Sequence, residues 1–241
     1  MILKKIFITL FSILFFNGCL SHHFVIDGDG NYISSTKKIE NFTSLHVSGG
    51  LSIHISGTQK ENEMTIFCDE NLSKYIRTYV DGSELIIDPE FNIYPSKQIK
   101  IILPFTQLQN LNFSGAVKFT HDSSIVFDSK NISLDVSGAN TLSLPLNNNF
   151  ADIDLSGASK VTFTGFVKSL HIDASGANTI EASELIANNI FIDASGASTF
   201  RLNVLDELNL NLSGAHKIYY KGNPSKINQD ISGASIIIKS E

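Results

Sequence analysis

The side chains of this chain best suited to chemistry are aspartates that recur at a fixed spacing. Each lies three residues before the glycine of a repeated Ser-Gly-Ala tripeptide, and the four in consecutive copies are Asp135, Asp154, Asp173 and Asp193. Carboxylate oxygens bind Ca²⁺ at about 2.3–2.6 Å, so these aspartates form a candidate ladder for a cation or a polar ligand. Asn112 and Asn211 hold the same place in two other copies, and the Gly-Gly-x-Gly-x-Asp pattern of calcium-binding β-rolls does not occur. Polar stacking is therefore enough to explain the column, and we predict no dedicated metal site and no cofactor.

Other residues typical of active sites are scattered along the chain. The sequence contains no Gly-x-Ser-x-Gly, His-Glu-x-x-His, phosphate-binding loop or Cys/His cluster. A glycosidase needs a specific carboxylate pair at a defined separation, whereas these aspartates repeat evenly. Cys68 has no cysteine partner and no recognisable base beside it, which favours a structural thiol over a nucleophile. We predict that the protein is not an enzyme, and a polysaccharide-active enzyme is the weakest alternative.

Composition and charge exclude two further classes. Hydrophobic residues make up 42% of the chain and charged residues 17%, which is typical of a folded protein rather than a disordered one. The formal net charge is -6, the only arginines are Arg77 and Arg201, and no basic cluster occurs. Nucleic acid is therefore not a predicted partner.

The elements that must position the aspartates come from an internal repeat. Ser-Gly-Ala occurs seven times at intervals of 18 to 23 residues, a period typical of stacked architectures. The residues two and four before each glycine, and four after it, are apolar in nearly every copy, with polar residues between them. This alternation predicts β-strands, and the unit is too short for a strand, a helix and two turns. The sequence therefore predicts an all-β protein with a parallel β-solenoid over residues 111–241.

The glycine of each repeat has a structural explanation. Equivalent residues of a solenoid lie above one another, so every coil must bend at the same place. Glycine permits a positive φ and a close backbone approach there, alanine adds little bulk, and the serine hydroxyl can bond to the next coil. We assign these glycines to the corners of the coils: Gly115, Gly138, Gly157, Gly176, Gly196, Gly214 and Gly233.

The N-terminal segment has the features of an export signal followed by a lipid attachment site. Two lysines precede an apolar run of 11 residues, Ile6 to Phe16. This run is too short to cross a bilayer, which needs about 20 apolar residues. We predict that residues 1–18 are a lipoprotein signal peptide and that Cys19 is lipidated and anchors the protein to the membrane. Residues 19–39 are polar and Gly/Ser-containing, and are predicted to be a tether.

Residues 40–110 lack the regular repeat, and their pattern predicts strands in hairpins and irregular coils. Residues 51–56 and 64–67 alternate in polarity on either side of a polar linker, which predicts a hairpin. A second hairpin is predicted for residues 77–80 and 84–87, around the Asp81-Gly82 turn. We expect this N-terminal β region of hairpins and irregular coils to start the stack and cover its first coil, because an uncovered coil exposes strand edges.

The repeated Asp-x-Ser-Gly-Ala signature, behind a lipoprotein-like signal, resembles the bacterial head GIN domain family of auto-transporter adhesins. Residues 42–49, 71–72, 81–87 and 99–104 resemble the family's upstream strands, so the likeness covers roughly residues 40–241. The resemblance implies a right-handed parallel β-helix and a role in adhesion.

These features together predict a non-catalytic cell-envelope lipoprotein that presents a rigid β-solenoid as an interaction surface. The ligand would be a surface glycan or a protein. A glycan-binding module of the envelope is the alternative, although the chain has no tryptophan to form an aromatic platform. Leu20 follows the predicted lipidated cysteine where an aspartate would signal inner-membrane retention, so we expect the protein at the outer membrane.

The last repeat ends without an element to cover it. Ser-Gly-Ala is followed only by Ser235 to Glu241, and Ile236 replaces the lysine or threonine of the earlier copies. An apolar, unpaired strand edge invites pairing with another chain. We therefore predict a homo-oligomer through the C-terminal coil, with fraying of the chain end as the alternative.

Overall fold

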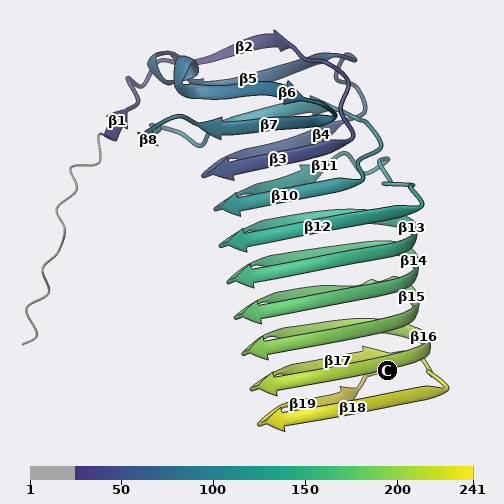
Figure 1. The fold of residues 1–241 in the computed structure, drawn as a ribbon. Helices are drawn as coiled ribbons and strands as arrows, with labels where there is room; N and C mark the ends of the chain where they lie inside the picture. The colour runs from purple at the N-terminus through teal and green to yellow at the C-terminus, as the bar shows by residue number, and fades with distance from the viewer. Residues whose placement is uncertain (1–24, 241) are drawn as a thin grey trace, which may run out of the picture.

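Successive coils of the repeat stack in parallel and in strict register (Figure 1). The structure is a computed structural model that describes residues 25–240. The predicted parallel β-solenoid is confirmed, because each repeat glycine pairs with the equivalent glycine of the next coil. The strands of the repeat are β10 (Asn110–Gly115), β11 (Lys118–His121), β12 (Asn131–Gly138), β13 (Thr141–Gly157), β14 (Lys160–Gly176), β15 (Thr179–Gly196), β16 (Thr199–Gly214), β17 (Lys217–Lys221), β18 (Lys226–Gly233) and β19 (Ile236–Lys239).

Each coil contributes to two sheets that enclose one core. The front sheet, nearer the viewer in Figure 1, holds β3 (Ser44–Gly49), β10, β12, β18 and the C-terminal halves of β13 to β16. The back sheet holds β4 (Ser52–Ser56), β11, β17, β19 and the N-terminal halves of β13 to β16. Alternate side chains point inward and fill the core, which explains the apolar period of the repeat. The largest fully buried side chains of this core are Phe113, Phe119, Phe127, Phe163 and Phe200.

The Ser-Gly-Ala corner is built from backbone contacts between neighbouring coils. The seven repeat glycines have φ between +96° and +124°, the left-handed region that favours glycine. The alanine N–H of each corner donates to the glycine carbonyl of the preceding coil, as Ala177 does to Gly157 at 2.8 Å. A Cβ on Gly176 would lie 2.2 Å from that same carbonyl oxygen. Two features of the corner therefore require glycine. One is the positive φ angle, and the other is the glycine carbonyl oxygen of the preceding coil, which leaves no room for a Cβ.

The residue after each corner alanine adds a ladder of hydrogen bonds between coils. Each side chain of the ladder accepts the backbone N–H of the equivalent residue in the preceding coil. The Ser159 N–H donates to Asn178 Oδ1 at 2.9 Å, and the Asn178 N–H donates to Ser198 Oγ at 3.1 Å. The corner ladder, buried except at its last member, is Asn140, Ser159, Asn178, Ser198, His216 and Ser235.

Asparagine and histidine play the same part in the corner ladder. The Asn178 Nδ2 donates to the Ser175 carbonyl at 2.8 Å, within its own coil. His216 Nδ1 accepts the Ser198 N–H at 3.1 Å, so the neutral ring carries its proton on Nε2, which faces the Ser213 carbonyl at 3.1 Å. The imidazole thus reproduces the acceptor and donor positions of the amide.

The stack begins earlier than residue 111, the predicted start of the solenoid. β3 pairs in parallel with β10, and Gly49 lies in register with Gly115. Ser48-Gly49-Gly50 forms a corner of the same kind, with φ +88° at Gly49 and a bond of 2.9 Å from the Ala116 N–H to the Gly49 carbonyl. The first coil therefore belongs to the N-terminal β region.

One of the two predicted N-terminal hairpins is present. β6 (Ile76–Asp81) and β7 (Glu84–Pro89) form the antiparallel hairpin expected around the Asp81-Gly82 turn. The hairpin of residues 51–56 with 64–67 is wrong. β4 lies between β11 and β9 (Lys100–Pro104) in parallel pairing, so both of its edges are occupied. β5 (Glu63–Asp69) therefore crosses to the end of the stack and pairs with other strands.

Part of the predicted tether, residues 19–39, is folded. β2 (Tyr32–Lys38) pairs antiparallel with β5, and β1 (Val25–Asp27) pairs with β8 (Asn92–Tyr94). Together with β6, β2 and β5 cover the N-terminal end of the solenoid (Figure 1). The polar composition of β2 reflects its place at the outer edge of this cap, where one face meets water.

A buried carboxylate holds the cap together. Asp69, the fully buried last residue of β5, accepts the Gly30 N–H at 3.0 Å and the Ser96 N–H at 2.8 Å. The Ser96 hydroxyl donates to it as well, and this bond is the first cause of the lowered pKa of Asp69. Gly28 packs so closely on the carboxylate that a Cβ there would lie 2.4 Å from Oδ2. The Asp-Gly-Asp-Gly segment thus wraps around Asp69.

We expect the cap to lose stability in acid through Asp69. Its folded-state pKa is lowered, so its carboxylate stabilises the fold above the ordinary carboxyl range near 4 and loses that effect as pH falls through the folded value. Asp69→Asn should therefore melt well below wild type at pH 7, and the gap should narrow as the pH approaches 2. Thermal melts across this range measure it, with the exposed Asp128→Asn as the matched control. A gap that stays constant with pH would contradict the assignment.

The predicted signal peptide, residues 1–18, and the predicted lipidation site, Cys19, lie outside residues 25–240. Within that range the helical structure is the 3₁₀ turn Glu70–Tyr75, and no helix there has the length and apolar character to cross a membrane.

Candidate functional site

Two columns of outward-facing side chains run side by side along the front sheet. The acid column, three residues before the corner glycines from Gly138 to Gly233, consists of Asp135, Asp154, Asp173, Asp193, Asn211 and Asp230. The mixed column, two residues further back on the same strands, consists of Asp152, His171, Phe191, Asn209 and Asn228. Because side chains on a strand alternate, both columns lie on the same face.

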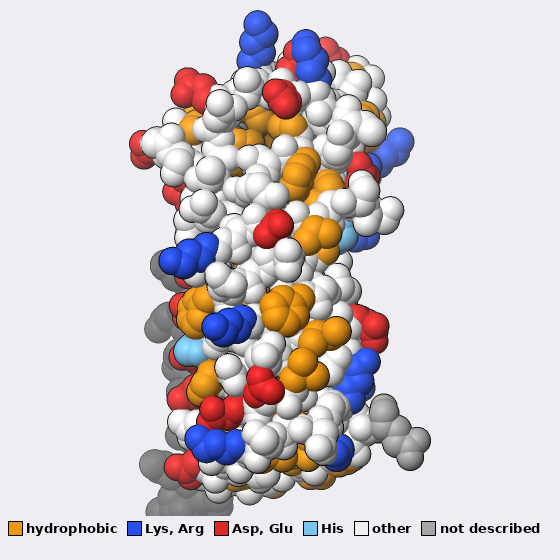
Figure 2. Space-filling model, turned by 90° about the vertical axis from the view of Figure 1, so that its right-hand side faces the viewer, with side chains coloured by type: hydrophobic (Ala, Val, Ile, Leu, Met, Phe, Trp, Pro, Cys, Tyr) orange, Lys and Arg blue, Asp and Glu red, His pale blue; other side chains and the backbone are white. Residues whose placement is uncertain are grey.

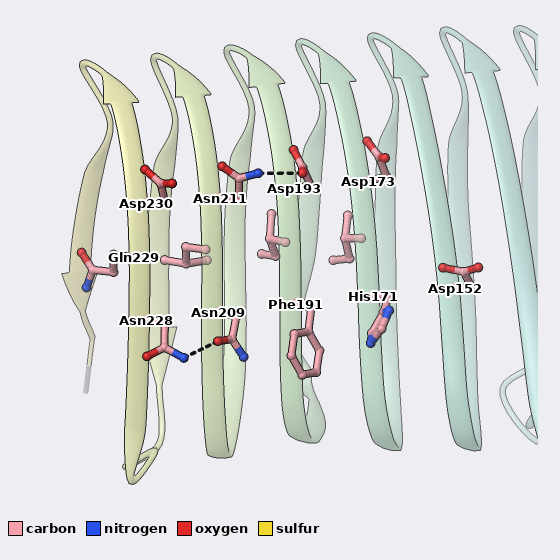
Figure 3. Close-up of a pocket in the computed structure, with 13 residues that line it drawn as sticks. Asp152, His171, Asp173, Phe191, Asp193, Asn209, Asn211, Asn228, Gln229 and Asp230 are labelled. Atoms are coloured by element: carbon pink, nitrogen blue, oxygen red, sulfur yellow. Dashed lines mark hydrogen bonds between the residues drawn. The ribbon is translucent and has the colours of Figure 1, made fainter.

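A shallow groove of about 580 Å³ lies between these columns. Figure 3 shows the acid column on one side of the groove and the mixed column on the other, from Asp152 to the last coil. Ile172, Ile192 and Leu210 lie between the columns and contribute to the floor. The groove therefore combines an apolar floor with carboxylate and amide walls, and it reaches β18 at the end of the stack.

Aromatic rings form part of the mixed-column wall. The ring centroids of His171 and Phe191 lie 4.7 Å apart, and Phe150 packs on the other side of His171 with its centroid also at 4.7 Å. His171 and Phe191 are only half-buried, so their remaining surface is open to a ligand. The rings are inclined by 68° and 60° to one another, and this row supplies apolar ring faces and edges on the wall opposite the carboxylates of Asp173 and Asp193.

Like charges are packed closely along the acid column. Two unit charges about 5 Å apart in water repel by roughly 0.8 kcal/mol. Burial raises the pKa of Asp154 above its ordinary value, and the neighbouring Asp135, Asp173 and Asp152 raise it further. Further along, the Asn211 amide donates to Asp193 Oδ2 at 2.8 Å and replaces a repulsive pair with a hydrogen bond. Amide side chains at intervals in the column therefore reduce the charge repulsion that the folded state must overcome.

Two of the four aspartates in the predicted ladder line the groove, and two do not. Asp173 and Asp193 line it, whereas Asp135 and Asp154 continue the same column beyond its lining. Within residues 25–240, no three His, Cys, Asp or Glu side chains form a group that could hold a metal ion. Neither lysine nor arginine lines the groove, so its charge suits a neutral or cationic polar ligand.

A serine, a histidine and an aspartate also meet outside the groove. Asp122 accepts the Ser56 hydroxyl at 2.7 Å and the Gly57 N–H at 2.9 Å, and it lies 3.0 Å from His54 Nε2. These bonds, first that from Ser56, lower the pKa of Asp122. In a catalytic triad the histidine lies between serine and aspartate, whereas here both contact the carboxylate. The cluster ties β4 to the loop after β11, and it lacks the geometry of a nucleophile.

Cys68 is a buried free thiol in the cap. Its side chain is fully buried, and burial is the first cause of its raised pKa. A thiol that resists ionisation is a poor nucleophile, so the predicted structural role fits its surroundings.

The corner opposite Ser-Gly-Ala carries exposed apolar side chains. Figure 2 faces this side of the molecule and shows hydrophobic side chains along it, with charged side chains between them and at the margins. Phe166 and Ile186 lie in register in adjacent coils, and Phe166, Ile186 and Leu205 are 40%, 42% and 44% exposed. We call these three residues the apolar ridge. It is a second surface that could contact a protein.

The mixed column was not singled out from the sequence. No residue type is common to all its members, so no letter repeated in every copy marks the position that Phe191 and His171 occupy. The signal that could have found it is the spacing itself, because these residues fall two positions before the acid column in each coil.

The fold and repeat match known proteins. Residues 41–224 match the family described as "Putative auto-transporter adhesin, head GIN domain". No curated protein matches the chain.

Several solved structures share the fold. A "putative adhesin" from Bacteroides fragilis has a TM-score of 0.78 at 19% identity, covering 88% of this chain and 98% of its own. A "putative lipid binding protein" from Parabacteroides distasonis has a TM-score of 0.64 at 19% identity, covering 88% of this chain and 99% of its own. A "putative adhesin" from the same species has a TM-score of 0.65 at 17% identity, with the same coverage.

Proposed function

The chain belongs to the head GIN domain family, and on that premise we propose that it is a non-catalytic cell-envelope lipoprotein that binds its ligand on the front sheet. The observation that carries the proposal is the groove between the acid and mixed columns. It spans five coils of a rigid stack, from β13 to β18, and presents polar walls and an apolar floor on one face. Such a surface suits recognition of an extended ligand, as expected of an adhesin-type protein.

The specific observation that favours a glycan is the half-exposed pair His171 and Phe191. Sugar rings pack their C–H faces on aromatic rings, and their hydroxyls bond to carboxylates and amides such as those of Asp193 and Asn211. The groove lacks lysine and arginine, so an uncharged glycan fits better than an acidic one.

The test is binding of residues 25–241 to an array of neutral glycans. Phe191→Ala and Asp193→Asn should each weaken binding at least about tenfold, because each removes one kind of wall contact. Thr179→Ala, on the outer face of the back sheet, is the matched control and should bind as wild type does. Binding unaffected by both groove variants would reject the groove. If the chain instead binds a protein ligand, and Phe166→Ser and Ile186→Ser abolish that binding whereas the groove variants do not, the binding site is the apolar ridge.

The anchor in this proposal is a lipid on Cys19, at the outer membrane. Its support is the signal-like segment before that residue, because an apolar run of this length is typical of export signals. Cys19→Ser should move the protein from the membrane to the soluble fraction, whereas the internal Cys68→Ser should leave it with the membrane. Protease treatment of intact cells then reports which side the solenoid faces. Retention of the Cys19→Ser variant in the membrane fraction would reject lipid anchoring.

A further inference from the structure

The two ends of the solenoid differ in how they are closed. At the N-terminal end, β2, β5 and β6 cover the stack (Figure 1). At the other end, among the strands that the structure describes, β18 pairs only with β16, and β19 pairs only with β17. Within residues 25–240 no strand covers the outer edges of β18 and β19.

The open end is apolar as well as unpaired. Every residue of β18 is exposed, including Ile227 and Ile231 on the side that faces the core in other coils. On β19, Ile236 is 53% exposed and lies in register with Lys217 of the preceding coil. Proteins normally protect such edges, because free N–H and C=O groups beside apolar side chains pair readily with another strand.

The charges of β18 match those of a second, antiparallel β18. Lys226, Asn228 and Asp230 alternate along the outer face of the strand. A twofold axis through Asn228 places Lys226 of each copy opposite Asp230 of the other, so the dimer contains two such pairs. Opposite charges facing each other across an antiparallel pair are stabilising.

We propose that two copies of this chain pair antiparallel through β18, centred on Asn228, so that their front sheets become continuous. The contact is a closed one, since each copy uses the same strand and the covered N-terminal end stops further addition. The groove reaches Asn228 and Asp230, and an axis through Asn228 places the two grooves on opposite sides of the paired Asn228 residues, so they meet end to end with a sideways offset. The dimer thus doubles the length of the binding surface, and its formation does not depend on any ligand.

Light scattering after size exclusion tests the dimer on residues 25–241, which hold the cap, the core and every strand that the structure describes. Wild type should have twice the monomer mass at high micromolar concentration. Lys226→Asp and Asp230→Lys should each raise the dissociation constant on the order of tenfold or more, because like charges then face each other. The double variant should restore the dimer. Lys160→Asp, an exposed lysine on the back sheet, should leave it unchanged.

Lys226 also bonds to Glu207 of its own chain at 2.7 Å, so its variant alone could act through the fold. Asp230→Lys is free of this ambiguity, and unchanged thermal melts show that each variant is folded. A strict monomer at high micromolar concentration would overturn the proposal. So would an oligomer that is indifferent to both charge reversals, or a filament of open-ended mass.

Discussion

Gly176→Val should destabilise the solenoid by roughly 3 kcal/mol or more, because two separate requirements of the corner are broken together. Gly176 has φ +96°, which a β-branched residue rarely adopts. Its Cβ would lie 2.2 Å from the Gly157 carbonyl oxygen, which already accepts the Ala177 N–H. The added atoms can be accommodated only if neighbouring coils separate, and separation breaks bonds on both sides of the corner.

Urea and thermal unfolding of residues 25–241 measure this effect. Gly176→Ala should also be strongly destabilising, since a single Cβ already meets the oxygen. Gly57→Ala is the matched control, because Gly57 lies in a turn with no atom within 4 Å of an added Cβ. A Gly176→Val variant that melts with wild type would show that the coils are not stacked at this corner.

Asn178→Leu should cost roughly 2–5 kcal/mol, although leucine is apolar and close to asparagine in size. Asn178 is buried, its Oδ1 accepts the Ser159 N–H, and its Nδ2 donates to the Ser175 carbonyl. Leucine leaves one backbone donor and one backbone acceptor unpaired in the interior, and each loses its bond to water without compensation. Equilibrium unfolding in urea checks this expectation.

The conservative comparison for the corner ladder is His216→Asn. His216 accepts the Ser198 N–H and faces the Ser213 carbonyl, the same two bonds that Asn178 makes in its own coil. The asparagine variant should therefore unfold close to wild type, whereas His216→Leu should lose stability. If the asparagine and leucine variants behave alike, the corner ladder contributes packing and not hydrogen bonding.

A corner defect should also reach the binding groove. The acid and mixed columns occupy the strand segments that lead into the Ser-Gly-Ala corners, within five residues of each glycine. Strands that separate at the corner carry Asp173 and Asp193 apart with them. Groove variants such as Phe191→Ala differ from corner variants because they change binding without changing the unfolding curve.

The sequence by itself determined the fold class and, within the Ser-Gly-Ala repeat, the strands and their register. In a solenoid each residue contacts its own equivalent about one coil away, so a repeated pattern in the sequence is already a map of contacts. The spacing of Asp173 and Asp193 placed them side by side on one face, as the structure has them. The same spacing placed Gly157 next to Gly176, so the corner could be expected before any coordinates were known.

The binding groove was only half predictable. The acid column was visible because the aspartate recurs, whereas the mixed column contains a different residue in almost every coil. His171 and Phe191 lie on the same surface as Asp173 because the strands that carry them stack side by side. The corner ladder was missed for a related reason, because asparagine, serine and histidine look unrelated until their hydrogen bonds are seen to be equivalent.

Only the tertiary structure decided the N-terminal cap. β5 pairs with β2 and β9 rather than with β4, its neighbour in sequence, because β4 is already enclosed between two strands of the stack. Residues 25–38 are polar enough for a tether, yet they form strands because buried Asp69 and the edge of β5 provide partners for their backbone. No repeat encodes these contacts. They depend on one buried carboxylate and on which strand edges the stack leaves free, and both follow from non-local packing.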